Sequence, residues 1–177
     1  MTTTDGRRLP TAAEEARFWS MLETAWAPLG DEVNEARRAL SAREPGTDAD
    51  VTPIERAFDE MLENLARDCH HLSDVELVDL DRVVERKLHD IDRADVHAVT
   101  DGSDDGFLYA RGFIVGMGHD FYHSVLRDPR MAIEDAEGGM LCYFFARLHS
   151  DRHNEGTYPA TGSGISREGG NLAGWPG

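Results

Sequence analysis

Cysteine is scarce in this sequence: there are two, Cys69 and Cys142, and neither belongs to a CxxC pair, so a disulfide framework is excluded. No apolar run approaches the ~18 residues that a membrane-spanning helix needs. The first ten residues also lack the apolar centre of a signal peptide. We therefore expect a cytoplasmic protein with reduced thiols and no membrane partner.

Basic residues are also few, since 18 Lys and Arg stand against 34 Asp and Glu, a formal net charge of −16. Such a surface repels phosphate backbones and anionic lipids, which argues against nucleic acid or a membrane as a direct partner. A basic peptide, a basic protein face, a small cationic ligand or a metal cation fits the sign of the charge. The simplest interpretation is that the acids keep the protein soluble.

Motifs of two large enzyme classes are missing. The chain has no GxSxG, which marks many serine hydrolases, and no GxxxxGK[ST], which marks phosphate-binding loops. Serine-nucleophile and phosphate-loop chemistry are therefore excluded.

Hydrophobic residues recur every three or four positions and never alternate over a sustained stretch, which predicts an all-α protein. Thr11 with Glu14, and Ser73 with Glu76, have the spacing of capping boxes at helix starts. Thr52 is followed by proline and marks a third start. We expect a compact bundle of about six helices.

Residues 107–126 are apolar on almost every side of a helix, and this pattern is typical of a buried helix. The other helices should surround it as a central element. From residue 151 onward the chain is rich in glycine, serine, threonine and proline, which predicts a flexible tail. The expected organisation is a flexible N-terminus (1–10), a helical domain (11–150) and a disordered tail (151–177).

The central stretch also collects the candidate binding residues. Asp104 and Asp105 fall in the first turn of the predicted helix, where exposed amides favour negative charge, and Arg111 follows six to seven residues later. Two interpretations remain open: a structural cap with an ion pair, or a carboxylate pair and an arginine that line a pocket for a cationic ligand. In the second, Asp101 extends the same acidic face. Asp101 also opens an EF-hand-like motif, but Gly112 stands where the calcium-binding glutamate is needed.

Histidines offer a second kind of site. His119 and His123 are four residues apart, and His-Asp-Phe-Tyr-His resembles the zinc-peptidase motif HExxH with aspartate in place of the glutamate. No third ligand is evident, and the alternative is a pair of rim histidines hydrogen-bonded to acids. His149 and His153 repeat the spacing, and Cys69-His70-His71 supplies further donors.

Several motifs of the central stretch occur together: the Ser103-Asp104-Asp105-Gly106-Phe107 box, Arg111, the apolar run through Ile114, Gly118, Tyr122 and Asp128-Pro129. In these residues, in Phe18-Trp19 and around Phe58, the chain resembles the bacterial family catalogued as domain of unknown function 4240, over about residues 15–135. It departs from the family at Leu88–Val99, where a tryptophan is usual, so packing around the box is expected to differ.

The resemblance implies a helical domain of Gram-positive and related bacteria with no assignable activity. Some relatives carry a WGR domain or were named as molybdate-metabolism regulators, but no WGR segment occurs here. Tyr122 is also one of the ligand-binding candidates.

These observations lead to one functional expectation and one alternative. The expectation is a binding or regulatory module that recognises a cationic or peptide partner through Asp101, Asp104, Asp105, Arg111 and Tyr122. The alternative is a metal-dependent hydrolase that uses Asp104 and Asp105 or the His119/His123 pair. No cofactor is predicted for the binding module, and a divalent metal belongs to the alternative.

Overall fold

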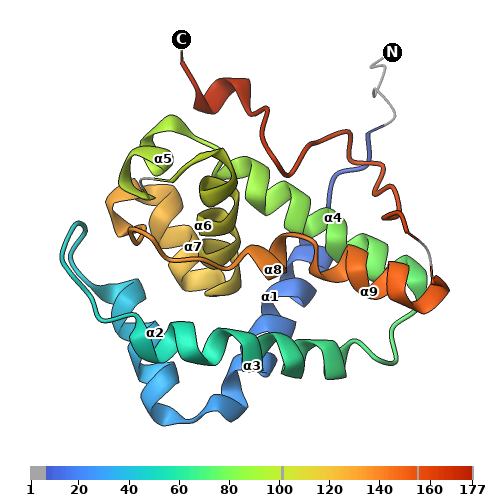
Figure 1. Ribbon diagram of the computed structural model, residues 1–177, viewed down its shortest axis with the longest axis horizontal. Coiled ribbons are helices and arrows are strands. Elements are labelled where there is room, and N and C mark those ends of the chain that lie inside the picture. The colour runs from blue at the N-terminus through green and yellow to red at the C-terminus, as the bar shows by residue number, and fades with distance from the viewer. Residues whose placement is uncertain (1–6, 101, 155, 177) are drawn as a thin grey trace.

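The computed structural model describes residues 7–100, 102–154 and 156–176, and within these ranges all regular structure is helical, as the sequence predicts (Figure 1). The α-helices are α1 (Ala12–Trp26), α2 (Asp31–Ala42), α3 (Thr52–Asp68), α4 (Asp74–Asp90), α5 (Ala94–Thr100), α6 (Asp104–Gly116), α7 (His119–Arg127), α8 (Gly139–Cys142) and α9 (Phe144–His153). Three short 3-10 helices are η1 (Ala27–Leu29), η2 (Pro129–Met131) and η3 (Leu172–Gly174). The described ranges thus hold more than the six helices expected, because turns divide the helical stretches and short helices such as α5, α7 and α8 follow them.

Helix α4 packs against α1, α6 and α9. Helix α3 packs against both α1 and α2, α7 rests on α2, and α6 contacts α4, α7 and α8 (Figure 1). None of the helices in the described ranges combines the length and hydrophobicity that a membrane span requires.

Local signals predicted the helix starts well. Both capping boxes form: Thr11 Oγ1 accepts a hydrogen bond from the amide of Glu14 at 3.2 Å, and Ser73 Oγ accepts from the amide of Glu76 at 3.3 Å. Helix α3 differs slightly. Thr52 is its first residue rather than its cap, and the Thr52 amide instead donates to Asp50 Oδ1 at 2.9 Å.

Glu76 fastens the start of α4 to α1. Its carboxylate accepts from the Ser73 amide and from Arg17 Nη2, each at 2.7 Å. These contacts, with the Ser73 amide first, lower the pKa of Glu76 to about 2. Because the folded-state pKa lies below the ordinary glutamate value, the resulting stability is complete above that value and is lost as the pH falls toward 2.

We therefore expect Glu76→Gln to destabilise the protein near pH 6 and to have progressively less effect as the pH falls from about 5 to 2. Urea unfolding of both proteins at several pH values measures the difference. The matched control is Glu60→Gln, because Glu60 is exposed and its carboxylate forms no hydrogen bond or ion pair with the described residues. A Glu76→Gln effect that stays constant from pH 6 to 2 would contradict the assignment.

The predicted central helix is buried in its first half and interrupted thereafter. All residues of α6 from Phe107 to Gly116 are buried except Tyr109. The helix does not continue to residue 126, because the chain turns at Met117-Gly118, where Gly118 has φ +99°. Other helices supply donors to the carbonyls at this turn: Trp26 Nε1 donates to Gly116 O and Arg37 Nη2 to Met117 O, both at 2.8 Å.

The C-terminal segment does not have the contact-free course expected of a flexible tail. Helix α9 extends to His153, past the predicted boundary at 150, and residues 157–176 run along α4 (Figure 1). The segment reaches the N-terminal residues as well, since the amide of Arg8 donates to Gly162 O at 2.9 Å. The residues 1–6 of the predicted flexible N-terminus lie outside the described part.

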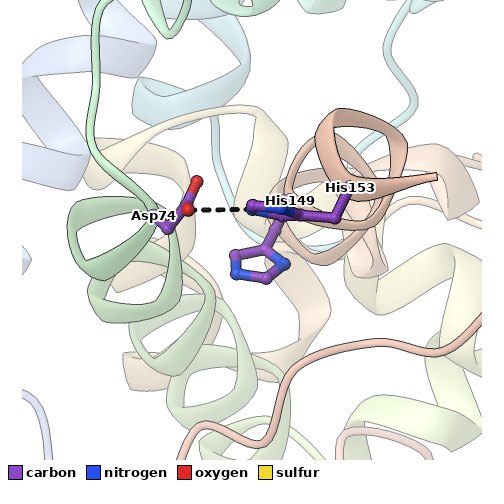
Figure 2. Close-up of side chains that lie close together, drawn as sticks. All are labelled: Asp74, His149 and His153. Carbon is purple, nitrogen blue, oxygen red and sulfur yellow. Dashed lines mark hydrogen bonds and ion pairs between the residues drawn. The ribbon is translucent and has the colours of Figure 1, made fainter. Parts of the chain in front are cut away.

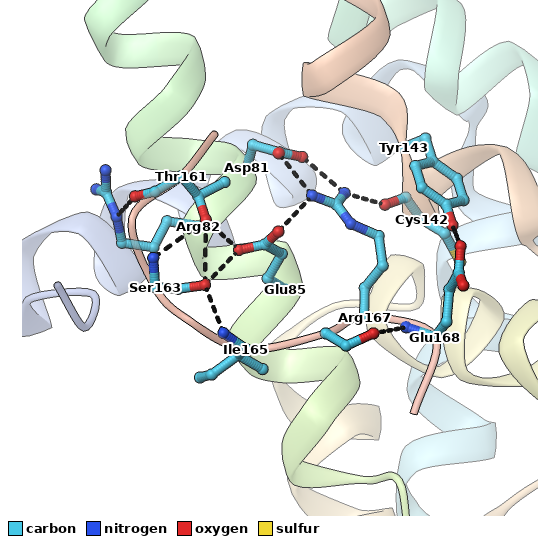
Figure 3. A network of polar contacts seen from close by, with 11 residues as sticks. Asp81, Arg82, Glu85, Cys142, Tyr143, Thr161, Ser163, Ile165, Arg167 and Glu168 are labelled. Carbon is cyan, nitrogen blue, oxygen red and sulfur yellow. Dashed lines mark hydrogen bonds and ion pairs between the residues drawn. The ribbon is translucent and has the colours of Figure 1, made fainter. Parts of the chain in front are cut away.

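Arg167 anchors this segment through a buried polar network (Figure 3). Its guanidinium donates to both oxygens of Asp81, at 3.0 and 2.7 Å, and to Glu85 Oε1 at 2.8 Å. The second Glu85 oxygen accepts from the hydroxyls of Thr161 and Ser163. Asp81 is fully buried and Arg167 is 8% exposed, so two acids of α4 depend on a cation from the far end of the chain.

Candidate functional site

Arg111 is buried and does not pair with the acids at the start of α6. Its guanidinium donates to three backbone carbonyls, those of Leu88 at 3.0 Å, Arg167 at 3.1 Å and Glu168 at 3.0 Å. It also lies over the Phe107 ring, 4.7 Å from the centroid. Burial lowers the pKa of Arg111 from its usual value. The prediction that Arg111 lines an open binding face is therefore wrong, and its role is to hold the C-terminal segment against α6.

Tyr122 is likewise removed from the surface. Its ring is fully buried, and its hydroxyl donates to the carbonyl oxygen of Lys87 at 3.1 Å. Burial raises the pKa of the Tyr122 phenol well above its usual range. Its placement among the ligand-binding residues is therefore also wrong.

The two carboxylates at the start of α6 are exposed to solvent. Asp104 and Asp105 occupy the first turn, which Ser103 caps through a 3.2 Å hydrogen bond from the amide of Gly106. Neither carboxylate forms an ion pair with Arg111, so the structural ion-pair interpretation is wrong as well. The third predicted acid, Asp101, lies outside the described residues.

Asp104 borders a groove that the C-terminal segment completes. The groove has a volume of about 390 Å³ and lies between the start of α6 and residues 168–175. Its lining combines carboxylates with aromatic and apolar side chains: Asp92, Asp104, Phe107, Glu168, Leu172 and Trp175, with Gly169, Gly170 and Asn171. No Lys, Arg or His is among these lining residues. We call it the acidic groove.

Trp175 is held in the acidic groove by a defined set of contacts. Its indole Nε1 donates to Asp92 Oδ1 at 2.9 Å, and its ring lies edge-to-face with Phe107 at 6.0 Å. The second Asp92 oxygen accepts from the Asn171 amide at 3.0 Å. Trp175 remains 42% exposed, so one part of the ring is fixed while another faces the solvent.

The His119/His123 pair lies on α7, and the two ring centroids are 4.2 Å apart. His119 Nδ1 lies 3.0 Å from Asp120 Oδ1, as expected for a rim histidine paired with an acid. The pair borders a second groove, of about 490 Å³, that also contains Arg37, Arg38 and Arg127. Burial first, and then His119 and nearby cations, lower the pKa of His123.

Three arginines line the groove beside the His119/His123 pair, against two acids, Glu23 and Asp120, so the net positive charge of the lining opposes the binding of a metal cation. Within the described ranges, no third His, Cys, Asp or Glu joins the pair with all ligand atoms inside 4.8 Å. The hydrolase alternative that uses this pair, or Asp104 and Asp105, stays a prediction.

A different set of metal-ligand residues comes together at the start of α4 and the end of α9. Asp74, His149 and His153 each place a ligand atom within 4.8 Å of the others (Figure 2). The sequence shows the histidine spacing but gives no sign of Asp74, because the carboxylate comes from another helix.

Comparison with known proteins places the chain in a family. The family model described as "Protein of unknown function (DUF4240)" matches residues 47–143, which is more than half of the chain. The chain belongs to the DUF4240 family. No curated protein and no solved structure matches it.

The DUF4240 match runs from just before α3 to just after α8 and so includes the whole of α6. Helices α1, α2 and α9 and the C-terminal segment lie outside it. The acidic groove is therefore composite: Asp104 and Phe107 come from the matched region, whereas Glu168 and Trp175 come from the segment that follows.

Proposed function

We propose that this DUF4240 protein is a cytoplasmic binding module whose acidic groove takes up a lysine or arginine side chain of a partner protein or peptide. One observation carries the proposal: two exposed carboxylates, Asp104 and Glu168, share a groove with the rings of Phe107 and Trp175, and no basic residue is among the lining residues. Carboxylates and an exposed aromatic ring, here that of Trp175, together attract a cationic side chain.

The expected strength follows from the exposure of these groups. An exposed ion pair contributes about 0–1 kcal/mol, and a cation over an aromatic ring about 0.5–2 kcal/mol. A single side chain should therefore bind with an affinity in the millimolar range, and a complete partner would need further contacts. The net charge of −16 would speed the approach of a basic partner.

The proposed compartment is supported by the two cysteines. Cys69 and Cys142 are free and buried, and burial raises the pKa of each thiol to about 12. Neither thiol is poised to react or to pair, which suits a reducing compartment.

The direct test uses N-acetyl-arginine amide and N-acetyl-lysine amide as probes, with N-acetyl-citrulline amide as the neutral control. We expect the cationic probes, but not the control, to shift the NMR signals of the Trp175 indole and of the Gly169 and Gly170 amides. Equal shifts with the citrulline probe would show that charge is not recognised and would overturn the proposal.

A pair of neighbouring variants locates the site. Asp104→Asn and Glu168→Gln should each weaken the binding of the cationic probes by about threefold to fivefold, because each removes an ion-pair contribution of up to about 1 kcal/mol. Asp105→Asn is the matched control, since Asp105 is exposed in the same turn but does not line the groove. If Asp105→Asn weakens binding as much as Asp104→Asn, the probe is responding to overall charge rather than to the acidic groove.

A further inference from the structure

The residues Asp74, His149 and His153 have the composition and geometry of a metal-ion site (Figure 2). Their ligand atoms lie within 4.8 Å of one another, and Nε2 of His153 is 2.8 Å from Oδ2 of Asp74. Nδ1 of His149 is buried and has no hydrogen-bond partner, so no other group of the described residues holds the ring through this atom. We propose that these three residues bind one divalent transition-metal ion, with Zn²⁺ as the expected ion.

The donor set favours zinc over the hard cations. Two imidazoles and one carboxylate suit Zn²⁺, whereas Ca²⁺ and Mg²⁺ prefer sites made of oxygen ligands. Tetrahedral zinc with bonds near 2.0–2.1 Å places its ligand atoms about 3.3 Å from one another. The 2.8 Å contact between His153 and Asp74 therefore has to open by about half an ångström, while the wider separations close. Three protein ligands leave the fourth position for solvent.

The ligands sit on elements that are already fixed in place. His149 and His153 are one helical turn apart on α9, and their ring centroids are 4.9 Å apart. Asp74 is the first residue of α4, which is held by the capping box of Ser73 and Glu76. Because α4 and α9 pack along each other, binding needs side-chain rotation rather than movement of a helix.

One neighbour opposes the metal and limits its affinity. Nη1 of Arg152 lies 3.4 Å from Asp74 Oδ1 and also donates to the Leu72 carbonyl at 2.6 Å. Nη2 donates to the Cys69 carbonyl at 2.9 Å, so the guanidinium is held near the end of α3. A fixed positive charge beside the carboxylate weakens cation binding, and we expect micromolar affinity rather than the much tighter binding of structural zinc sites.

The metal site is independent of the acidic groove. Asp74 begins α4, whereas Asp92 of the groove follows the end of that helix, and the 17 residues of α4 span about 25 Å. The α7 histidines provide an internal comparison, because His119 and His123 have the same spacing but share their groove with three arginines and lack a third ligand residue within reach.

The test is calorimetric titration of the metal-stripped, tag-free full chain with ZnCl₂, together with thermal unfolding. We expect one Zn²⁺ per chain and, at a hundredfold excess over the dissociation constant, an unfolding midpoint raised by roughly 5–10 °C. His149→Ala/His153→Ala should abolish the response, and Asp74→Asn should weaken binding at least tenfold. The matched control His119→Ala/His123→Ala should bind as the wild type does.

Each outcome bears on the proposal. The absence of heat and of a midpoint shift in the wild type would overturn it, as would binding that survives in His149→Ala/His153→Ala or disappears in the α7 control. Circular dichroism of the metal-free variants checks folding. If the double alanine variant unfolds, Asp74→Asn decides, because it leaves Ser73 and Glu76 to cap α4, and wild-type affinity in that variant would refute the site.

Discussion

Replacement of Arg167 by methionine is expected to lower the free energy of unfolding by about 3–5 kcal/mol, since it leaves buried carboxylates without their cation. Asp81 is fully buried and receives two hydrogen bonds from Arg167, and Glu85 receives a third. Guanidinium chloride unfolding near pH 7 measures the change. The control Arg38→Met alters an exposed arginine and should change stability by no more than about 0.5 kcal/mol.

The same variant has a defined pH dependence. Burial raises the pKa of Asp81 and Arg167 opposes this, so loss of Arg167 should raise the pKa further. When the pKa of a carboxyl is higher in the folded than in the unfolded protein, the protonated carboxyl costs the folded state least. The free energy of unfolding then decreases as the pH rises through the folded-state pKa. We therefore expect Arg167→Met to be less destabilising at pH 4 than at pH 8, and addition of Asp81→Asn to recover part of the loss. An effect no larger than that of Arg38→Met would refute the packing of residues 157–176 on α4.

Gly112→Ala is expected to destabilise the protein by about 2–3 kcal/mol, because overpacking where the neighbour is backbone cannot be relieved by rotating a side chain. A Cβ at Gly112 would lie 2.5 Å from the carbonyl oxygen of Gly138 and 2.7 Å from Cys142 Sγ. The change therefore forces α8 away from α6. Urea unfolding monitored by circular dichroism measures the loss.

Gly106→Ala is the matched control for this substitution. Gly106 is in the first turn of the same helix, where a Cβ would meet only Ser103 Oγ, at 3.3 Å. Because alanine favours the helix over glycine, we expect this variant to be neutral or up to about 0.5 kcal/mol more stable. Equal losses in the two variants would mean that close packing of α6 against α8 is not what requires Gly112.

The helical class and the helix starts could be predicted because they depend on neighbours in the chain. Thr11 and Ser73 meet their glutamates three residues later, so sequence spacing alone reveals both caps. The burial of Phe107–Gly116, with the exception of Tyr109, follows from an apolar pattern around the helix. Hydrophobic periodicity does not predict the turn at Gly118, because the apolar spacing continues across it and the donors that stabilise it come from Trp26 and Arg37.

The candidate site was predictable only in part, since its other half comes from distant residues. Sequence spacing favours Asp104 and Asp105 as partners for Arg111, but two of the carbonyls that bind Arg111 are 56 and 57 residues away. Glu168 and Trp175 belong to a segment whose glycine-rich composition resembles that of a free tail. The isolated apolar residues Ile165, Leu172 and Trp175 are the signals in this sequence that such a segment packs.

Because the chain is synthesised from its N-terminus, the position of Arg167 delays the final folding of α4 and its neighbours. Arg167 follows Asp81 by 86 residues, so at 5–20 residues per second the ribosome adds it roughly 4–17 s after the acid that it neutralises. During that interval, Asp81 and Glu85 of α4 cannot form the ion pairs that they have in the folded protein. A chain cut by a protease before Arg167 would leave Asp81 and Glu85 without their cation, and such a chain would be less stable and more open to further degradation.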